Sequence, residues 1–339
     1  MRLSYARFDL KLKHTFTISR SSRDVSPVDL VQIEHNGVIG FGEAAPSTRY
    51  GESVDSVEQF LSKLAFEKFD DPFQLESVLT YVDCTAPDNS SAKAAVDIAL
   101  HDLVGKLLGL PLCVYWGLDR EKTPLTSFTI GIDAPPVIEQ KVREAEEYPI
   151  LKIKLGGTND EEIIRTIRKV TQKTLRVDAN EGWKTREVAV ERIKWLEQEG
   201  VEFIEQPMPA ADLRGTAWVR ERVNLPLIAD ESSARLHDVP KLQGVFDGIN
   251  IKLMKCAGLR EAMRMIHTAR ACGLKVMVGC MIESSVGISA AAQLSPLVDY
   301  ADLDGNVLVS NDPFEGVSIV NGKLKLPNRP GIGVMTKSD

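Results

Sequence analysis

Four short apolar runs between residues 150 and 230 decide the fold, and each has charged residues at or near its carboxyl end: ILKIKLG (150–156), TLRVDAN (174–180), EFIEQP (202–207) and LPLIAD (225–230). Amphipathic segments separate these runs. The segment TREVAVERIKWLEQEG, for example, places Ala189, Ile193 and Leu196 on one helical face, and Gly200 ends it. A chain that alternates strands with helices in this way is typical of a parallel sheet covered by helices.

The same alternation continues on both sides of this stretch. Four further runs have the length and composition of strands: LTSFTIG (125–131), GINIKL (248–253), KVMVGC (275–280) and VDYADLD (298–304). Eight strands and seven helices predict a closed (β/α)8-type barrel, which is an α/β fold. An open doubly wound sheet is the alternative. It is less favoured because no glycine-rich phosphate loop follows the first strand, and because polar residues gather at many strand ends.

The length of the chain and the pattern before the barrel predict a second domain. The 339 residues exceed the roughly 250–300 residues at which one hydrophobic core stops growing. Residues 1–112 predict an α+β capping domain, in which Asn36-Gly37 marks a hairpin and residues 54–108 are helical. We expect the barrel to occupy residues 113–312. Residues 313–339 then return as short strands and pack on the capping domain.

Composition excludes several classes of partner. The chain is 43% hydrophobic and 26% charged, and its net charge of −7 argues against nucleic acid or an anionic membrane. No run of about 18 apolar residues is present, and the alternating N-terminus indicates a strand and not a signal peptide. Five cysteines without a paired short spacing argue against disulfides and a zinc site. We expect a cytoplasmic protein that forms a homo-oligomer.

Three acidic residues end successive strands and predict a metal site. Asp178, Glu205 and Asp230 follow one another at steps of 27 (178 to 205) and 25 residues (205 to 230). Barrel active sites lie at the carboxyl ends of the strands, where these side chains would meet. Three carboxylates repel one another unless a cation neutralises them, and an all-oxygen set suits Mg²⁺. Each residue taken singly is equally compatible with a helix cap or a salt-bridged strand end.

Lysines precede and follow the acidic residues along the chain. Lys152 and Lys154 are two residues apart and therefore point to the same side of their strand. Lys252 ends the sixth predicted strand and faces Lys154 across the barrel mouth. Like charge and burial both lower a lysine pKa, so these amines are candidate bases. Solvated lysines on an edge strand are the alternative.

Two amines on opposite sides of a substrate carbon suit removal of a proton from one face and its return to the other. A proton α to a carboxylate is too weakly acidic for an amine alone. A metal that binds the carboxylate oxygens can stabilise the enediolate that forms, and the Lys152 cation could help to hold the same oxygens.

The segments LKIKLGG, RVDANEGW, FIEQPMP, ADESS and NIKLMKCAG, in this order, resemble the enolase superfamily in its muconate-lactonizing-enzyme subgroup. The resemblance extends over essentially the whole chain, and the superfamily uses a Lys or His base with Mg²⁺. Within the subgroup the chain is most similar to the dipeptide epimerases, a group that includes L-Ala-D/L-Glu epimerases. The implied reaction inverts the α-carbon of the C-terminal residue of an L,L-dipeptide.

The resemblance also implies roles for individual residues. Lys154 and Lys252 match the positions of the two bases, and Lys152 matches a contact to the substrate carboxylate. The remaining substrate contacts implied by the family pattern are Thr129, Cys280 in GCMIESS, and the pair Asp302 and Asp304, which would hold the α-ammonium group.

The segment FTISRSSRD resembles a lid of this superfamily. Its Arg20 is predicted to contact substrate, and an arginine here, Arg20 or Arg23, could pair with a side-chain carboxylate of a dipeptide. Solvated loop arginines are the alternative.

Two other functions remain open on the sequence. One is a different reaction on the same scaffold, such as o-succinylbenzoate synthesis or a cycloisomerisation. Those acidic substrates have no evident need for Asp302 and Asp304. The other is a non-catalytic small-molecule binder, although every metal and base position holds a competent residue.

Overall fold

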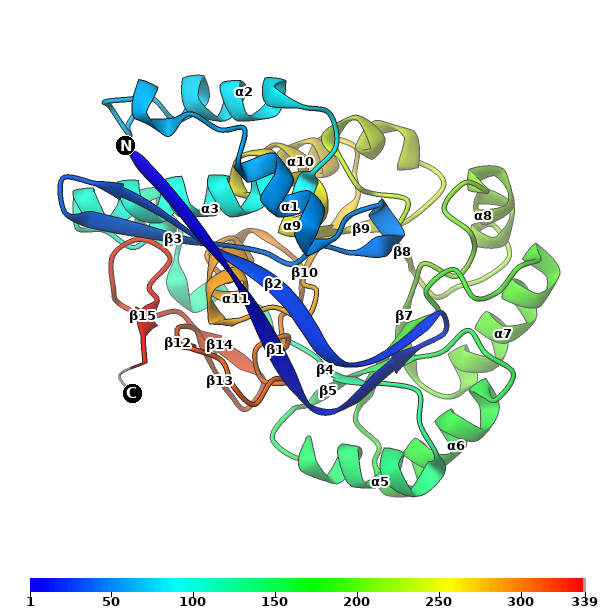
Figure 1. Ribbon diagram of the computed structural model, residues 1–339. Helices are drawn as coiled ribbons and strands as arrows, with labels where there is room; N and C mark the ends of the chain where they lie inside the picture. The colour runs from blue at the N-terminus through cyan, green and yellow to red at the C-terminus, as the bar shows by residue number, and fades with distance from the viewer. Residues whose placement is uncertain (338–339) are drawn as a thin grey trace.

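The centre of the molecule is an eight-stranded parallel sheet that curves into a barrel (Figure 1). The structure, a computed structural model, describes residues 1–337. The strands are β4 (Phe128–Ile130), β5 (Ile150–Lys154), β6 (Thr174–Asp178), β7 (Val201–Glu205), β8 (Leu227–Ala229), β9 (Gly248–Lys252), β10 (Lys275–Gly279) and β11 (Tyr300–Asp302). Each strand pairs with the next one along the chain, and a parallel bridge between Thr126 and Ala301 brings the two ends of the sheet together. The predicted barrel is confirmed.

Helices connect the strands and cover the outside of the barrel. They are α5 (Pro135–Glu144), α6 (Asp160–Val170), α7 (Arg186–Gln198), α8 (Leu213–Arg220), η4 (Leu236–Leu242), α9 (Leu253–Cys256), α10 (Leu259–Ala271), α11 (Ser285–Ala292) and η5 (Ser295–Leu297). The Thr185 side chain accepts a hydrogen bond from Val188 N and caps α7, whose face of Ala189, Ile193 and Leu196 is buried as predicted. The connection after β8 is the 3-10 helix η4, which contains Pro240.

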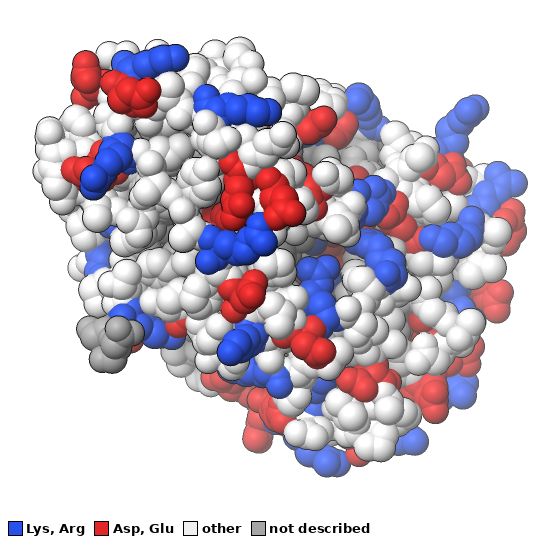
Figure 2. Space-filling model, viewed as in Figure 1, with Lys and Arg blue, Asp and Glu red and all other residues white. Residues whose placement is uncertain are grey.

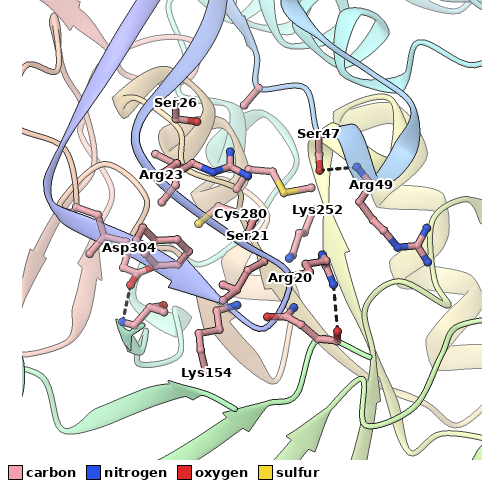
Figure 3. A pocket seen from close by; sticks show the side chains of 18 of the residues that line it. Arg20, Ser21, Arg23, Ser26, Ser47, Arg49, Lys154, Lys252, Cys280 and Asp304 are labelled. Carbon is pink, nitrogen blue, oxygen red and sulfur yellow. Dashed lines mark hydrogen bonds between the residues drawn. The ribbon is translucent and has the colours of Figure 1, made fainter. Parts of the chain in front are cut away.

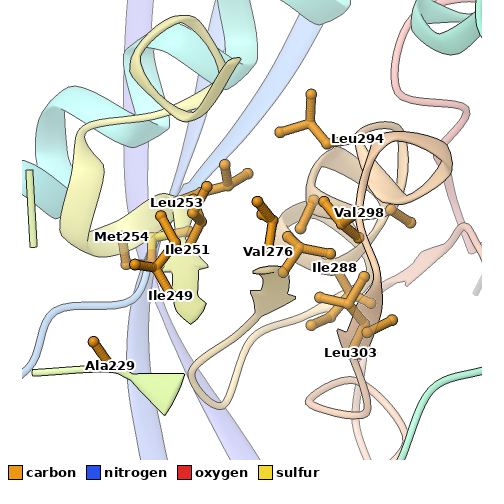
Figure 4. Close-up of a cluster of buried hydrophobic side chains, with 14 of the residues drawn as sticks. Ala229, Ile249, Ile251, Leu253, Met254, Val276, Ile288, Leu294, Val298 and Leu303 are labelled. Carbon is orange, nitrogen blue, oxygen red and sulfur yellow. The ribbon is translucent and has the colours of Figure 1, made fainter. Parts of the chain in front are cut away.

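Alternation along the barrel strands separates the site from the core. Ile249 and Ile251 of β9 lie in the apolar cluster drawn in Figure 4, together with Val276 of β10. Asn250 and Lys252, which alternate with these isoleucines along β9, point to the other side and bond to carboxylates inside the barrel. Because successive side chains of a strand face opposite ways, one short run supplies both the packing against helices and the polar interior.

The capping domain is an antiparallel sheet with helices on one side. Its strands are β1 (Arg2–Ile18), β2 (Ser21–His35) and β3 (Val38–Ala44), and its helical segments are η1 (Thr48–Tyr50), α1 (Val54–Leu61), η2 (Phe66–Lys68), α2 (Leu75–Thr85) and α3 (Ser90–Leu108). Asn36 and Gly37 form the predicted hairpin turn, with φ of +51° and +80°. A Cβ atom on Gly42 would lie 1.9 Å from the Ala95 carbonyl oxygen, so the close packing of β3 on α3 requires glycine.

Helix α3 joins the two parts of the molecule, because it is buried on both faces. Ala95 and Ala99 lie in the core of the capping domain, whereas Ala94 and Ile98 lie in the core of the barrel. From the same helix, Asp97 accepts hydrogen bonds from two backbone amides at the start of α10, Leu259 N at 2.6 Å and Arg260 N at 3.2 Å. The capping domain is therefore packed firmly against the barrel.

The C-terminal segment contacts both parts of the molecule. After α4 (Leu112–Tyr115) and η3 (Arg120–Lys122), the remaining elements are β12 (Phe314–Glu315), β13 (Ser318–Val320), β14 (Lys323–Lys325) and β15 (Met335–Thr336). Ile332 N donates to Asp102 of α3 at 2.8 Å, and Gly322 O accepts from Thr126 N, just before β4, at 2.8 Å. The domain limits at residues 112 and 312 stay a prediction.

The surface carries both signs of charge. On the face viewed in Figure 2, lysines and arginines are interspersed with aspartates and glutamates, as expected for a chain with 41 basic and 48 acidic residues. Within residues 1–337, no helix has both the length and the apolar character needed to cross a membrane.

Asp29 is an uncompensated acidic group in the capping sheet. It lies opposite Arg7 in the β1–β2 register and is fully buried. Neither of its carboxylate oxygens has a hydrogen-bond partner among the described residues, because Arg7 instead pairs with Asp55 and Glu58 of α1. Burial, together with the negative charge of Glu58, raises the pKa of Asp29 to about 6.

This position predicts a pH-dependent gain in stability for Asp29→Asn. The folded-state pKa of about 6 exceeds the ordinary value of 3.8, so the wild-type protein loses stability as pH rises through this interval. We expect the variant to be more stable by on the order of 1–2 kcal/mol above pH 6.5 and little changed at pH 4. Urea unfolding at both pH values measures this, with the exposed Asp9→Asn as control. A variant less stable than wild type at pH 7.5 would contradict the interpretation.

Candidate active site

Three buried carboxylates converge at the carboxyl ends of neighbouring barrel strands. Asp178 ends β6, Glu205 ends β7 and Asp230 directly follows β8. Asp178 and Glu205 are paired across the two strands, so their side chains start side by side. One oxygen from each of the three residues lies within 4.8 Å of the others, and all three residues are at most 1% exposed. The convergence expected from the sequence spacing is present, and these oxygens could hold a metal ion.

Three lysines of the barrel strands β5 and β9 reach this carboxylate cluster. Lys152 Nζ lies 2.7 Å from Glu205 Oε2 and 3.2 Å from Asp178 Oδ2. Lys154 Nζ donates to Asp178 Oδ2 at 2.7 Å, and Lys252 Nζ donates to Asp230 Oδ2 at 2.8 Å. Lys154 comes from β5 and Lys252 from β9, so the two amines reach the cluster from different sides of the barrel.

The carboxylates shift the pKa of two of these lysines upwards, opposite to the direction that like charge and burial alone would give. Burial by itself lowers the pKa of Lys152, but the negative charges of Asp302 and Glu205 outweigh it and hold that pKa well above its usual range. The pKa of Lys252 is raised as well, because the attraction of Asp230 outweighs burial. The prediction considered like charge and burial but not the distance of each amine to a carboxylate.

The carboxylates shift in opposite directions. Burial and the negative charge of Asp178 raise the pKa of Glu205 to about 7. Burial alone would also raise the pKa of Asp230, but the ammonium groups of Lys252 and Lys255 lower it well below its usual range. The lysines are shared unequally within the cluster, because Lys252 and Lys255 both lie against Asp230. Among the lysines of the described residues, by contrast, only Lys152 lies within 4 Å of Glu205.

Two neighbours fix the carboxylates in place. Lys255, in α9, donates to Asp230 Oδ1 at 2.6 Å and to the backbone oxygens of Asp230 and Asn250. Asn250 donates from Nδ2 to Glu205 Oε1 at 2.8 Å. Sequence reasoning missed Asn250. Its position two residues before Lys252 on the same strand was the available signal, since both side chains must face the interior.

Asp302 and Asp304 lie at the opposite wall from the carboxylate cluster. Asp302 accepts from Lys152 Nζ at 2.7 Å and from Ser127 Oγ at 2.7 Å. Asp304 accepts from the backbone N–H of Thr129 at 2.7 Å, and no lysine or arginine in the described part of the chain lies within 4 Å of it. Burial and the negative charge of Asp302 raise the pKa of Asp304 to about 6. Asp304 is therefore a buried acidic group whose charge no described lysine or arginine offsets at close range, and it suits a cationic group of a ligand.

A cavity of about 240 Å³ lies between the capping domain and the barrel mouth, and the three lysines that contact the carboxylate cluster from β5 and β9 line it (Figure 3). The residues predicted to act on substrate all line it: Arg20, Thr129, Lys152, Lys154, Lys252, Cys280, Asp302 and Asp304. The capping domain contributes Phe16 and Ile18 of β1 and the segment 45–49. Among the described residues that line it there is no histidine.

The two arginines of the predicted lid have different surroundings. Arg20 is engaged by protein groups, since its NH2 lies 2.8 Å from Glu231 Oε1 and its NH1 donates to the Asn180 carbonyl at 3.2 Å. Arg23 also points into the cavity (Figure 3) but has no ion-pair or hydrogen-bond partner among residues 1–337. Burial and the nearby positive charge of Arg20 lower the pKa of Arg23. Arg23 is therefore the guanidinium available to a bound anion.

Two family models match the chain. Residues 5–117 match the model described as mandelate racemase/muconate lactonizing enzyme, N-terminal domain. Residues 137–339 match the model described as enolase C-terminal domain-like. Together they match the chain from residue 5 onwards except for residues 118–136, which include β4.

Individual proteins are similar over the full length. A protein from Bacteroides thetaiotaomicron named L-Ala-D/L-Glu epimerase is 56% identical, and the match covers 99% of this chain and 88% of that protein. The substrate-liganded L-Ala-D/L-Glu epimerase from Bacillus subtilis has a TM-score of 0.93 at 30% identity, covering 99% and 98% of the two chains.

The dipeptide epimerase from Cytophaga hutchinsonii, solved with Mg and D-Ala-L-Val, has a TM-score of 0.92 at 31% identity, covering 99% and 96%. Family models and similar proteins thus agree over both halves of the chain. The chain belongs to the mandelate racemase/muconate lactonizing enzyme family of the enolase superfamily.

Proposed function

We propose that this protein is a Mg²⁺-dependent dipeptide epimerase, an isomerase that inverts the α-carbon of the C-terminal residue of an L,L-dipeptide. One observation carries the proposal. The ammonium groups of Lys154 and Lys252 enter a single cavity from β5 and β9, each beside a different carboxylate of the same cluster. Its relatives include proteins named as dipeptide epimerases, one of them solved with Mg and a dipeptide.

The carboxylate cluster fits a magnesium ion. Asp178, Glu205 and Asp230 offer only oxygen ligands, as Mg²⁺ prefers. Glu205 Oε2 is buried and makes no hydrogen bond within the described residues, although Lys152 Nζ lies 2.7 Å away. When bound, Mg²⁺ would supply positive charge that favours both the negative charge developing on the substrate carboxylate and the neutral form of the neighbouring amines.

Lys154 and Lys252 perform the proton transfers. One amine takes the α-proton from the carbon, and the ammonium on the other side delivers a proton to the opposite face. The same pair works in both directions, so the reaction is reversible. The close carboxylate beside each lysine, Asp178 or Asp230, holds the amine in position.

The remaining polar groups orient the dipeptide along the cavity. Lys152 lies between the carboxylate cluster and Asp302, where its cation can contact the substrate carboxylate. Asp304, which has no cationic partner among residues 1–337, suits the α-ammonium group at the other end, together with Asp302. Thr129 and Cys280 line the cavity near these two aspartates and complete the contact surface.

An acidic side chain on the epimerised residue suits Arg23. Its guanidinium lies in the cavity without an anion from the described part of the chain beside it, whereas Arg20 is already paired with Glu231. A carboxylate is the natural partner of an unpaired, half-buried guanidinium. We therefore assign the contact to the substrate side chain to Arg23 and propose L-Ala-L-Glu or a related acidic dipeptide as substrate.

A dipeptide library incubated with the protein in D₂O tests the proposal. Mass gain in a dipeptide reports exchange of its α-proton, and chiral separation reports inversion. No deuterium incorporation into any dipeptide would favour a non-catalytic binder. Turnover of a succinylbenzoate precursor or a lactone without dipeptide exchange would favour another reaction on the same scaffold.

We also propose that the protein works as a homo-oligomer in the cytoplasm. Exposed apolar side chains on and next to the capping domain, Phe73 at 53% and Tyr115 at 47%, support an interface. Five free cysteines support a reducing compartment. Light scattering coupled to size exclusion measures the oligomeric state, and a monomer at micromolar concentration would contradict the first part.

Replacement of either base should separate exchange from inversion. We expect Lys154→Ala and Lys252→Ala to lose epimerisation by about 10²–10⁴-fold, the usual contribution of a positioned acid or base. Each variant should still exchange the α-proton of one configuration in D₂O, and the two variants should act on opposite configurations. The exposed Lys194→Ala is the control. Full activity in either variant would exclude the assignment.

Magnesium should stabilise the fold through the carboxylate cluster. A ligand at 100 times its Kd adds about 2.7 kcal/mol to the free energy of unfolding. We expect MgCl₂ to raise the Tm of the wild type relative to EDTA, and Asp230→Asn to lose this increase. Thermal unfolding with and without Mg²⁺ measures it, and the exposed Asp119→Asn should respond as wild type does. An equal increase in the Asp230 variant would argue against this site.

Neutralising Arg23 should change the substrate preference. We expect Arg23→Met to lower kcat/KM for L-Ala-L-Glu by about 10–100-fold, because a charge-assisted hydrogen bond contributes about 1.5–3 kcal/mol. The value for L-Ala-L-Gln, which lacks the charge, should fall by less than about threefold. Equal losses for both dipeptides would show that Arg23 does not read the side-chain charge.

A further inference from the structure

Two arginines of the capping domain cross the mouth of the cavity and pair with glutamates of the barrel. Arg49, in η1, approaches Glu181 with both Nε and NH2, at 2.7 and 2.9 Å. Arg20, at the tip of the β1–β2 hairpin, pairs with Glu231 at 2.8 Å, and a dashed line in Figure 3 marks its bond to the Asn180 carbonyl. The two contacts join separate capping-domain loops to the loops that follow β6 and β8.

The barrel side of this contact is held in an unusual conformation. Asn180 and Glu181 are consecutive non-glycine residues with φ of +43° and +65°, a region that costs free energy for such residues. The conformation is maintained because Glu181 N donates to Gln206 O at 2.9 Å and Glu181 Oε1 accepts from Ala210 N at 2.8 Å. The surrounding backbone therefore presents the Glu181 carboxylate in a fixed direction towards Arg49.

Both ion pairs have the features that make such pairs effective. The Glu181 side chain is 12% exposed and that of Glu231 is fully buried, while the arginines are about one-third exposed. Fully exposed ion pairs contribute little, but a bidentate arginine–carboxylate pair with a buried acceptor is stronger and fixes geometry. We therefore expect these two ion pairs to stabilise the contact between capping domain and barrel more than exposed surface pairs would.

We propose that Arg20, Arg49, Glu181 and Glu231 form a latch that holds the two capping-domain loops closed over the substrate cavity. These four are positioning residues and touch no reacting atom. The latch rests on the proposed function only in that the enclosed ligand is the dipeptide. An open latch would let substrate dissociate faster and leave the proton transfer between the lysines intact, so KM rises and kcat is nearly unchanged.

The latch also adjoins the carboxylate cluster. Asn180 N donates to Asp178 Oδ1 at 2.9 Å, and Glu231 follows Asp230 in the chain. The barrel residues that the two arginines contact are therefore adjacent to two of the three carboxylates. Opening one pair should weaken the other, because both share the segment that contains Asn180.

Trypsin tests the latch without reference to any substrate. Cleavage after Arg20 and Arg23, at the hairpin tip, is followed by mass spectrometry in the wild type, Arg49→Gln, Glu181→Gln and the double variant. We expect each single variant to be cleaved at the tip at least about fivefold faster, and the double variant to be no faster than the singles. Added NaCl should accelerate cleavage of the wild type but not of the variants. The Tm should stay within about 2 °C of wild type.

Steady-state kinetics with L-Ala-L-Glu gives the second readout. We expect KM to rise about tenfold in Arg49→Gln, which corresponds to about 1.4 kcal/mol, with kcat within about twofold of wild type. Arg49→Lys should recover part of the loss. The control is Arg143→Gln, which removes an exposed pair with Glu139 far from the cavity.

Wild-type tip cleavage in Arg49→Gln, or a fall in kcat without a change in KM, would overturn the latch. Faster tip cleavage in the variants of a protein that epimerises no dipeptide would retain the latch and reject the proposed function. The two failures are therefore distinguishable.

Discussion

Mutual repulsion among three buried carboxylates is the constraint on which the rest of the site depends. Asp178, Glu205 and Asp230 are brought together by the pairing of adjacent strands, and burial makes each uncompensated charge costly. Lysine side chains of the barrel contact the cluster and offset its negative charge, Lys152 and Lys255 among them. The same compensation places amines around a point where a divalent ion fits, so charge balance and the proposed chemistry use one set of residues.

The capping domain completes the site because the barrel mouth alone is open. Helix α3 packs into both cores and fixes the capping sheet on the barrel, which leaves the β1–β2 tip and η1 above the carboxyl ends of the strands. Arg23 then enters the cavity, while Arg20 and Arg49 are directed to glutamates of the barrel. The capping sheet is thus held by apolar packing of α3, whereas its loops over the cavity are held by ion pairs. A site that admits and encloses a small molecule needs both a fixed base and loops that can release.

Most of the fold and much of the site could be predicted from the sequence, because the signals are local. The strand runs and the α7 face follow from period-2 and period-3.6 patterns, and the residues at the strand ends follow from the geometry of any parallel barrel. The roles of Asp302 and Asp304 came from family resemblance and not from a physical pattern. Asn250 was overlooked because an isolated asparagine has no distinctive spacing, although its contact to Glu205 is direct. The lysine pKa directions could not be predicted without interatomic distances.

The sequence by itself determined which side chains face the barrel interior, since alternation along a strand leaves no choice once the apolar residues are buried. Only the tertiary structure decided which of the two lid arginines, Arg20 or Arg23, has no ion-pair partner among the described residues. Arg20 and Arg23 are three residues apart and chemically identical, and what separates them is the position of Glu231, more than 200 residues further along the chain. Contacts of this kind depend on how two domains pack, and no local pattern encodes the distance between charges that packing brings together.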